Sequence, residues 1–503
     1  MGVNTGQILA NRAFLTPNLE ACVGAGYRYT FKEVNARANR WASYLAANGL
    51  KRGDRIAVLA KNNEHATCTL YGAAKTGVIT VLMNWRLTGT ELSYILNDSG
   101  ACLLVYDAEF ASVVDQIRPL IPTTRFVRKG GQGTDPEFEA VLTEGSDDEP
   151  IYMGGGNDAC IIMYTSGTTG KPKGAMISHN NTHWASLGLT HTLRWAHKDR
   201  YMLVAPLFHI GGLAPYFANV HVGATTVFMP DFDPVKVFQT MAEERINFLM
   251  TVPLMLQAMA MVPEAARPKL PHFRHFVCGA APVPASLIRL YDQCGLKICQ
   301  VYGATEYSGA ITFWTHDMGL DKVATAGRPV FHGAVKVFAP GTAAELPRGE
   351  VGELCLFGPQ VFLGYWNNPL ATKQVLTDGC YRSGDLGKID ESGCVTVVDR
   401  LKDMIISGGE NIYPAELETV IKAHPSVVEV AVTGKPSRKW GEVPVAFIVT
   451  KPTASVTEEE IMDLCRKDLA GFKCVKEVRF VQAIPKNATG KILKHELRGQ
   501  LAE

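Results

Sequence analysis

The sequence predicts a large N-terminal α/β domain followed by a small α+β C-terminal domain. Helix and strand signals alternate in the residues before about 128 and again over residues 157–330. Such alternation predicts crossover units and mostly parallel sheets. Residues 335–399 change to short β segments broken by glycine. We therefore expect two parallel-rich α/β subdomains, a small β-barrel-like or antiparallel subdomain, and a separate C-terminal unit.

The first stretch begins with a helix signal over residues 31–48 and a buried strand over residues 55–59. A second helix is expected over residues 90–97, followed by the apolar strand 101–106. Residues 129–157 are rich in Gly, Asp and Glu, which predicts a solvated connection between the two subdomains.

The later elements follow the same reasoning. In the second subdomain, the apolar runs 248–252 and 276–278 predict strands. After residue 400 the pattern becomes that of a compact α+β unit with its own helices and strands. Its expected elements are a helix over 414–424, a strand over 427–432, a helix opened by the capping-box spacing of Thr457 and Glu460, and a strand over 478–481.

Composition indicates an ordinary globular protein of the cytoplasm. The 503 residues exceed a single core, and the formal net charge of +1 favours neither nucleic acid nor a strongly acidic surface as a partner. Twelve scattered cysteines without metal-ligand spacing fit a reducing compartment. Lys75 interrupts the apolar run 70–85, and we expect no transmembrane segment and no secretory signal. A peripheral membrane contact and a homodimer both stay open.

A loop rich in glycine and hydroxyl groups follows the apolar segment 159–163. Residues 164–174 read Tyr-Thr-Ser-Gly-Thr-Thr-Gly-Lys-Pro-Lys-Gly. Small residues let backbone N–H groups approach a ligand, while hydroxyls and lysines supply further donors, a combination suited to polyphosphate. The loop is not a Walker motif, because Pro172 follows Lys171 where that motif needs a hydroxyl. Taken alone, the loop could also be an ordinary surface turn.

Further segments occur downstream in a fixed order. They are Val301-Tyr-Gly-Ala-Thr-Glu306, Tyr381-Arg-Ser-Gly-Asp385, the stretch 399–416, and Pro485-Lys-Asn-Ala-Thr-Gly-Lys491. Together with the loop, they resemble the adenylate-forming superfamily of acyl-CoA synthetases, luciferases and peptide-synthetase adenylation domains. The resemblance runs from residue 29 to residue 491. Residues 400–416 are most similar to bacterial fatty-acyl-CoA synthetases, with aryl-CoA ligases next.

The resemblance implies a mobile two-domain enzyme. Residues 1–400 would form the ATP- and acyl-binding domain, residues 401–402 the hinge with Lys402 at its centre, and residues 403–503 a lid. The lid would close over ATP for adenylation and then turn to present another face to coenzyme A. Lys491 in the lid would neutralise the substrate carboxylate and the α-phosphate.

Adenylation joins two anions, so positive charge and magnesium are expected at the site. Glu306 offers a carboxylate to Mg²⁺, and the resemblance adds Thr165 as a second metal contact. The expected catalytic residues are Lys491, Thr165, Glu306 and His209. The expected ATP and AMP contacts are Thr165, Ser166, Gly167, Thr168, Thr169, Gly170, Lys173, Gly279, Ala280, Ala281, Tyr302, Gly303, Ala304, Thr305, Asp385, Arg400 and Lys491.

Within this set, the roles differ by chemistry. Residues 279–281 are too small to block a flat base, and the resemblance makes them part of the adenine site with Tyr302. Asp385 can accept from both ribose hydroxyls, and the guanidinium of Arg400 can reach ribose or phosphate oxygens. Without the resemblance, Asp385 and Arg400 would be a solvated aspartate and a surface arginine.

The coenzyme A and acyl sites rest on fewer signals. The resemblance places Ser407, Gly408 and Gly409 beside the pantetheine channel, and suggests contacts to the nucleotide part of coenzyme A from Arg438, Lys439 and Trp440. The expected acyl pocket comprises Phe208, His209 and Tyr307. A lone histidine among apolar residues is otherwise a core residue. No cation is evident near these residues for a second carboxylate.

We therefore expect an ATP-dependent acyl-CoA synthetase that activates a medium- or long-chain fatty acid and releases AMP and pyrophosphate. ATP, Mg²⁺ and coenzyme A are the expected ligands. An aryl-acid CoA ligase of the coumarate or benzoate type is the alternative within the class. A peptide-synthetase adenylation module is disfavoured because no carrier domain follows Lys491, and a stand-alone adenylation enzyme delivering to a carrier protein is a further alternative. A non-catalytic binding protein would lack Lys491, Glu306 or Asp385, and all three residues are present.

Overall fold

The computed structural model describes residues 2–165, 172–377, 379–407, 410–452, 456–469, 471, 473–486 and 492–501. The chain divides into two compact units. The first unit comprises residues 1–335 and 356–381, and the second comprises residues 336–355 and 382–503. Among the described residues, no helix combines the length and apolar character needed to cross a bilayer.

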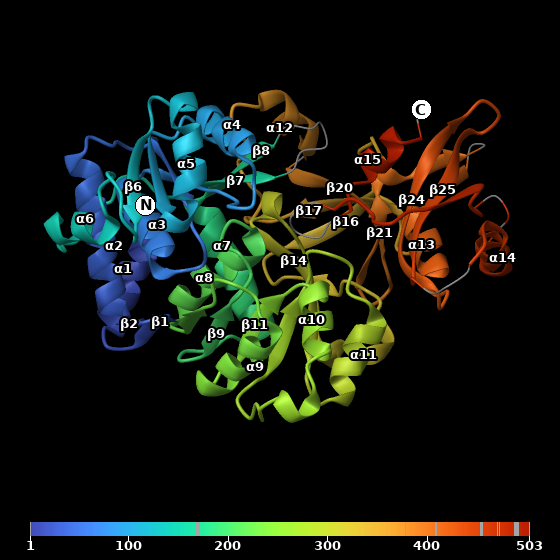
Figure 1. Ribbon diagram of the computed structural model, residues 1–503, viewed down its shortest axis with the longest axis horizontal. Helices are drawn as coiled ribbons and strands as arrows, with labels where there is room; N and C mark the ends of the chain where they lie inside the picture. Colours follow the sequence, from blue (N-terminus) through green and yellow to red (C-terminus); the bar gives the residue numbers. More distant parts are fainter. Residues whose placement is uncertain are drawn as a thin grey trace. The chain divides into compact units, whose positions relative to one another are not determined.

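The first sheet belongs to the first unit and is mostly parallel (Figure 1). In spatial order its strands are β18 (Gly364–Tyr365), β8 (Lys173–Ser178), β7 (Ala159–Thr165), β4 (Ile79–Leu82), β3 (Arg55–Leu59), β5 (Leu103–Asp107) and β6 (Arg125–Lys129). Strands β8 and β18 run antiparallel at one edge. The helices of this region are α1 (Thr5–Leu15), α2 (Phe31–Ala47), α3 (Glu64–Thr76), α4 (Gly89–Ser99), α5 (Ala111–Ile117) and α6 (Phe138–Glu144).

The second sheet is also mostly parallel and lies in the same unit. Its order is β15 (Arg328–Pro329), β14 (Gly309–Trp314), β13 (Ile298–Ala304), β12 (His275–Cys278), β11 (Phe248–Thr251), β9 (Arg200–Leu203), β10 (Thr225–Phe228), β1 (Glu20–Gly24) and β2 (Tyr27–Thr30). Its helices are α7 (His179–Leu193), α8 (Ile210–Val222), α9 (Pro234–Glu243), α10 (Pro253–Ala260) and α11 (Ala285–Gln293).

Helices fill the space between these two sheets. Helix α7 packs on β8 of the first sheet and on β14 of the second, and α8 packs on α7 and on β9, β10, β11 and β14. Tyr71 of α3 meets the rings of Tyr216 and Phe217 on α8. The two sheets and the helices between them therefore form one layered body. Open α/β sheets bind ligands at the carboxyl ends of their parallel strands, so the candidate site is expected at these ends.

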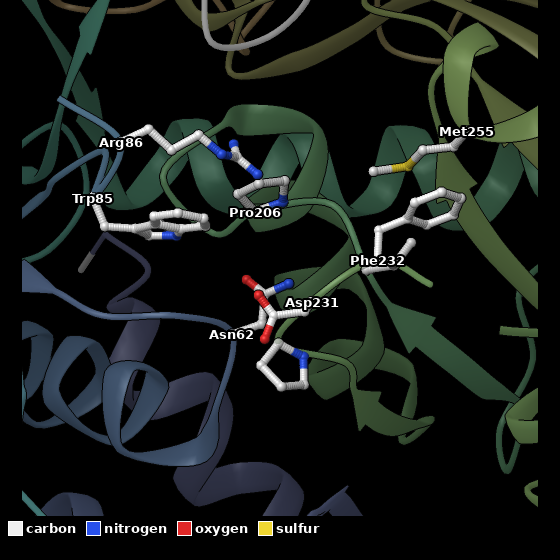
Figure 2. A pocket seen from close by; sticks show the side chains of 9 residues that line it. Asn62, Trp85, Arg86, Pro206, Asp231, Phe232 and Met255 are labelled. Atoms are coloured by element: carbon white, nitrogen blue, oxygen red, sulfur yellow. The ribbon is translucent and has the colours of Figure 1, made fainter. Parts of the chain in front are cut away.

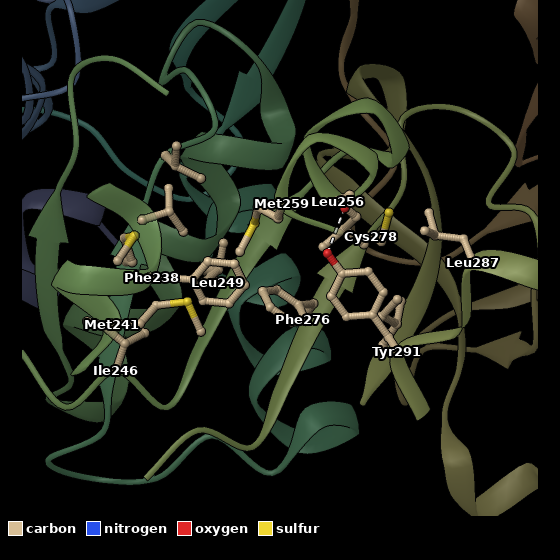
Figure 3. Packing of buried hydrophobic residues seen from close by; sticks show 14 of the residues in the cluster. Phe238, Met241, Ile246, Leu249, Leu256, Met259, Phe276, Cys278, Leu287 and Tyr291 are labelled. Carbon is tan, nitrogen blue, oxygen red and sulfur yellow. Dashed lines mark hydrogen bonds between the residues drawn. The ribbon is translucent and has the colours of Figure 1, made fainter. Parts of the chain in front are cut away.

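An apolar core fixes the strands of the second sheet that precede the candidate site. Figure 3 shows Phe238 of α9, Leu249 of β11, Phe276 of β12 and Tyr291 of α11 packed together. The Tyr291 hydroxyl donates to the carbonyl of Leu256, at 2.6 Å, so the one polar atom of this ring is satisfied. This packing holds the ends of β11 and β12 in place.

A third sheet, antiparallel in its β19–β20 and β20–β21 pairs, lies in the sequence between the two mostly parallel sheets and the C-terminal region. Its order is β16 (Ala334–Phe338), β17 (Gly352–Phe357), β20 (Cys380–Ile389) and β19 (Leu376–Thr377), with β21 (Val395–Arg400) beside β20. Helix α12 (Pro369–Val375) lies between β18 and β19 in the sequence.

The fourth sheet forms the C-terminal α+β unit. Its order is β23 (Glu410–Ile412), β22 (Ile405–Ser407), β25 (Gly441–Thr450) and β24 (Val427–Ser437), with β26 (Glu477–Phe480) parallel to β25. Helices α13 (Pro414–Lys422), α14 (Glu458–Asp468) and α15 (Lys494–Gly499) accompany it. Thr457 and Glu460 form the expected capping box of α14.

The predicted fold class is confirmed, with one local correction. Residues 129–157 are not only a solvated connection, because they contain α6. Phe138, Val141 and Leu142 of this helix are buried, and the Phe138 ring lies 5.1 Å from that of Trp41 on α2. The helical spacing of these three apolar residues indicates a helix, but the polar, glycine-rich composition of the surrounding stretch led to the prediction of a connection alone.

Candidate active site

The base of the predicted phosphate loop is a β-hairpin of the first sheet. Thr165 ends β7 and pairs with Lys173 at the start of β8. The Thr165 hydroxyl donates to the Lys173 carbonyl, at 3.5 Å. The Lys173 ammonium lies 5.4 Å from the centre of the Tyr365 ring on β18. The loop residues Ser166, Gly167, Thr168, Thr169 and Gly170 lie outside the described residues.

Tyr365 connects this hairpin to the predicted metal carboxylate. Its hydroxyl donates to Oε1 of Glu306, at 2.9 Å, and Glu306 follows β13 in the short 3₁₀ turn Thr305–Tyr307. Burial raises the pKa of Tyr365, and the neighbouring Glu306 adds to the effect, so the phenol remains a donor. The structure thus places Lys173 and Glu306 against one tyrosine, with Thr165 paired to Lys173 on the neighbouring strand.

This arrangement fits a magnesium ion of the substrate-bridging type. Among the residues that the structure describes, no group of three or more His, Cys, Asp or Glu side chains is placed to hold a metal ion alone. Mg²⁺ is instead usually held by one or two carboxylates plus substrate phosphates. A single oriented carboxylate at Glu306, beside the hydroxyl and ammonium of the hairpin, matches that chemistry.

The predicted adenine segments meet at neighbouring strand ends. β12 and β13 are paired in parallel, so residues 279–281, which follow β12, lie beside residues 302–305 at the end of β13. If Gly279 were replaced by a residue with a side chain, its Cβ would lie 2.4 Å from the carbonyl oxygen of Val301. A Cβ at position 303 would lie 2.5 Å from the carbonyl oxygen of Gly309. Glycine is therefore required at both positions for this close backbone approach.

The ribose candidates form a pair in the second unit. Asp385 on β20 pairs with Arg400 on β21, and the Arg400 Nε atom lies 2.6 Å from Oδ1 of Asp385. The Asp385 side chain is 6% exposed and the Arg400 side chain 42% exposed. The aspartate is thus held in place by a cation that keeps its own access to solvent.

The hinge candidate Lys402 lies in the 3₁₀ turn Leu401–Asp403, directly after β21. Burial lowers the pKa of Lys402, with Arg400 and Arg498 acting in the same direction. Lys491 lies outside the described residues.

The coenzyme A candidates gather at one end of the fourth sheet. Ser407 on β22 pairs with Gly441 on β25, directly after the turn that carries residues 438–440. Trp440 is 46% exposed, and the Lys439 ammonium lies 4.8 Å from its ring centre. An exposed aromatic ring with a cation over it can receive a nucleotide base and its phosphates. Gly408 and Gly409 lie outside the described residues, and Arg438 precedes Lys439 in the same turn.

The acyl candidates lie where α8 begins. His209 precedes α8, and its ring packs against Phe208 with 4.6 Å between ring centres. Its buried Nε2 atom has no hydrogen-bond partner within the described part of the chain. Burial, aided by the charge of Arg86, lowers the pKa of His209 to about 4, so the imidazole is neutral at neutral pH. Tyr307 is buried, and its hydroxyl donates to the carbonyl of Phe357, at 2.7 Å.

The start of α8 also approaches the segment after β13. A Cβ on Gly309 would lie 3.2 Å from the Cβ of Ala214 on α8, so these two backbones lie close together. His209 therefore precedes a helix that packs on β14, the strand after Glu306.

Sequence reasoning missed a pocket near Phe208 that is lined by both Arg86 and Asp231 (Figure 2). It lies beyond the carboxyl ends of β4, β9 and β10, and is lined by residues that include Asn62, Trp85, Arg86, Pro206, Asp231 and Phe232. The Arg86 guanidinium lies 4.3 Å from the Trp85 ring centre and 5.7 Å from that of Phe208. Arg86 is thus a cation close to one of the expected acyl residues that sequence reasoning did not single out. The available signal was an arginine shortly after an apolar strand.

The fold and these strand-end features define an AMP-binding enzyme. The family described as "AMP-binding enzyme" matches residues 9–366, and that described as "AMP-binding enzyme C-terminal domain" matches residues 416–491. The chain belongs to this family, and the resemblance to adenylate-forming enzymes is confirmed.

Named relatives make the family assignment more specific. The chain is 40% identical over 503 residues to the long-chain-fatty-acid–CoA ligase FadD13 of Mycobacterium tuberculosis, covering 99% of this chain and 98% of that protein. It is 37% identical to a feruloyl-CoA synthase of an Amycolatopsis species, covering 97% of each. The solved O-succinylbenzoate coenzyme A synthetase MenE of Bacillus subtilis, in complex with ATP and magnesium ion, is 30% identical with a TM-score of 0.86, covering 99% of each chain. These relatives are acid–thiol ligases with different acids.

Proposed function

We propose that the protein is an AMP-forming acid–CoA ligase. A carboxylate attacks the α-phosphate of ATP and expels pyrophosphate, and the thiol of coenzyme A then takes the acyl group and releases AMP. The observation that carries the proposal is the contact of both Lys173 and Glu306 with Tyr365, with Thr165 paired to Lys173, in a chain similar over its whole length to named CoA ligases.

The residues around Tyr365 bind the phosphates of ATP. Lys173 offers a cation and Thr165 a hydroxyl at the base of the loop. Glu306, oriented by the Tyr365 hydroxyl, and Thr165 would hold Mg²⁺. When bound, that ion supplies neutralisation of the β- and γ-phosphate charge. Lys491 supplies the cation for the meeting of carboxylate and α-phosphate.

The remaining nucleotide contacts follow the shapes of their segments. Residues 279–281 and 302–305 bind adenine, since glycine at positions 279 and 303 lets the neighbouring backbone come close to each segment. Asp385 accepts from the two ribose hydroxyls, and Arg400 holds that carboxylate in place. His209 is neutral and lines the acyl site, where it excludes water beside the reacting carboxylate.

The C-terminal region acts as a lid. Residues 1–400 form the ATP- and acyl-binding domain, residues 403–503 form the lid, and Lys402 is the hinge between them. Residues 407–409 border the pantetheine, and Arg438, Lys439 and Trp440 contact the nucleotide part of coenzyme A. Support comes from the pairing of Ser407 with Gly441, which follows the 438–440 turn, and from the exposed Trp440 ring.

We propose a medium- or long-chain fatty acid as the substrate. The 40% identity to a long-chain-fatty-acid–CoA ligase supports this acid. Each buried methylene contributes about 0.8 kcal/mol, so an apolar tunnel lowers KM steadily as the chain lengthens. An aromatic acid is the second candidate, supported by the 37% identity to a feruloyl-CoA synthase. A closed aryl pocket favours one flat ring and rejects long chains by overpacking.

The test is the rate of pyrophosphate release with hexanoate, dodecanoate, hexadecanoate, benzoate and coumarate, each with and without coenzyme A. The proposal predicts kcat/KM rising from hexanoate to the longer alkanoates and sustained turnover only with coenzyme A. A preference for either aromatic acid over all three alkanoates overturns the fatty-acid assignment. Sustained turnover with a carrier protein but not with coenzyme A overturns the CoA-ligase assignment.

A further inference from the structure

Helix α13 begins without a capping side chain of its own. Its N-cap residue is Tyr413, which makes no side-chain cap bond, and Pro414 occupies the first helical position. The first N–H groups of a helix need acceptors from outside the helix. One is supplied from far away in the sequence, because the Ala415 N–H donates to Oδ2 of Asp399, at 2.8 Å. The other carboxylate oxygen of Asp399 accepts from the Arg400 N–H, at 2.7 Å.

This bond spans the proposed hinge at Lys402. Asp399 lies on β21 before the hinge, and Ala415 lies in the lid after it. A carboxylate at a helix N-terminus is favourable both as a hydrogen-bond acceptor and as a charge facing the helix dipole. The bond therefore stabilises the lid orientation in which α13 lies against β21.

Side-chain contacts on each side of Lys402 hold the backbone in place, so the proposed rotation of the lid is confined to the short segment between them. Before the hinge, Arg400 is tied to Asp385 across the β20–β21 pair. After it, the guanidinium of Arg498 on α15 donates to the carbonyl of Lys402, at 3.2 Å, and to the Asp403 carboxylate, at 2.8 Å.

The same guanidinium also donates to Thr433 on β24, at 2.9 Å. The carbonyl of Lys402 thus moves with the lid, and a turn about residues 401–402 separates Asp399 from α13 without disturbing the Arg498 contacts.

We propose that Asp399 is a positioning residue for the two-step reaction. Its carboxylate holds α13 of the lid against β21, and this bond breaks each time the lid turns to the other orientation. This inference rests on the proposed function and on the hinge at Lys402. Losing one helix cap of this kind changes an equilibrium about fivefold. Because each half-reaction draws on one lid orientation, the ratio of the two rates changes by the same factor.

The test is Asp399→Ala, with the two half-reactions measured separately. Acyl-adenylate formation is followed by the pyrophosphate burst without coenzyme A, and thioester formation by adding coenzyme A to supplied acyl-adenylate. We expect the ratio of the two rates to change about fivefold. Asp399→Asn keeps an acceptor oxygen and fills the same volume, so it should change the ratio of the two rates in the same direction but by a smaller factor. This variant replaces Asp399→Ala in the test if the alanine variant does not fold.

Thr457→Ala is the matched control. Thr457 caps α14 within the same lid, by accepting from the Glu460 N–H at 3.2 Å, and does not span the hinge. It should lower the stability of the lid and leave the ratio of the two rates unchanged. Equal losses in both half-reactions of Asp399→Ala, or an unchanged ratio, would overturn the proposal. A wild-type enzyme that forms no acyl-adenylate would instead overturn the proposed function.

Discussion

The Asp385→Asn substitution tests the ribose contact with the least disturbance of the fold. Asparagine has the same shape and keeps one acceptor oxygen but loses the negative charge. Hydrogen bonds to a charged acceptor are worth about 1 kcal/mol more than neutral ones. Two ribose hydroxyls then cost about 2 kcal/mol, which is roughly a 30-fold rise in the Kd for ATP.

The same structure predicts a small effect on stability. The partner of Asp385 is Arg400, whose side chain is 42% exposed and keeps its hydration when the ion pair is lost. Ion pairs of this exposure contribute at most about 1 kcal/mol, so Tm should fall by only a few degrees. A large rise in the Kd for ATP with little change in Tm would show that Asp385 acts on the ligand and not on the stability of the fold.

The assay is calorimetric titration with ATP, together with KM for ATP and for coenzyme A. Asp390→Asn is the control, because Asp390 lies in the turn after β20 and accepts from the Cys394 N–H, at 2.9 Å. It should leave the Kd for ATP unchanged. The ribose assignment would be refuted if Asp385→Asn raised the Kd for ATP less than threefold, or if it raised the KM for coenzyme A as much as the KM for ATP.

Three further predictions follow from the charges and the hinge. Lys491→Ala should slow acyl-adenylate formation by about two to three orders of magnitude and affect thioester formation from supplied acyl-adenylate far less; equal losses in a stopped-flow comparison would contradict the assigned role. Lys402→Pro should retain one half-reaction and lose the other, because proline cannot follow the change in φ; unaltered overall turnover would exclude a hinge there. His209 and His275 have their pKa lowered from 6.5 to about 4 by burial, so between these values the unfolded chain binds more protons. Stability in urea titrations should therefore fall as pH decreases from about 6.5 to about 4, and constant stability over that range would contradict neutral burial.

Local patterns in the sequence were enough to predict most elements and the motif order. The apolar run 55–59 became β3 with the same bounds, and Thr457 caps α14 through the spacing read from the sequence. Such features depend on neighbours a few residues apart, where propensity and periodicity act directly. The order of the phosphate, adenine and ribose segments also follows the chain, so a family pattern could locate them.

Contacts between distant segments could not be predicted in this way. Arg86 meets Phe208 because strands of two different sheets end near one pocket, and neither residue is unusual in its own surroundings. Asp399 would be taken for an ordinary strand-end carboxylate, since its partner Ala415 lies 16 residues later. Tertiary packing decides these pairs, and one sequence carries no local signal for them.

The central claim is that one chain forms an acyl-adenylate and then a thioester. The most direct measurement is a single-turnover reaction of the enzyme with ATP, Mg²⁺ and dodecanoate, with products identified by mass spectrometry before and after adding coenzyme A. We predict dodecanoyl-AMP and one equivalent of pyrophosphate before the addition, then dodecanoyl-CoA and AMP after it. Formation of ADP and phosphate, or an adenylate that persists unchanged when coenzyme A is added, would contradict the account.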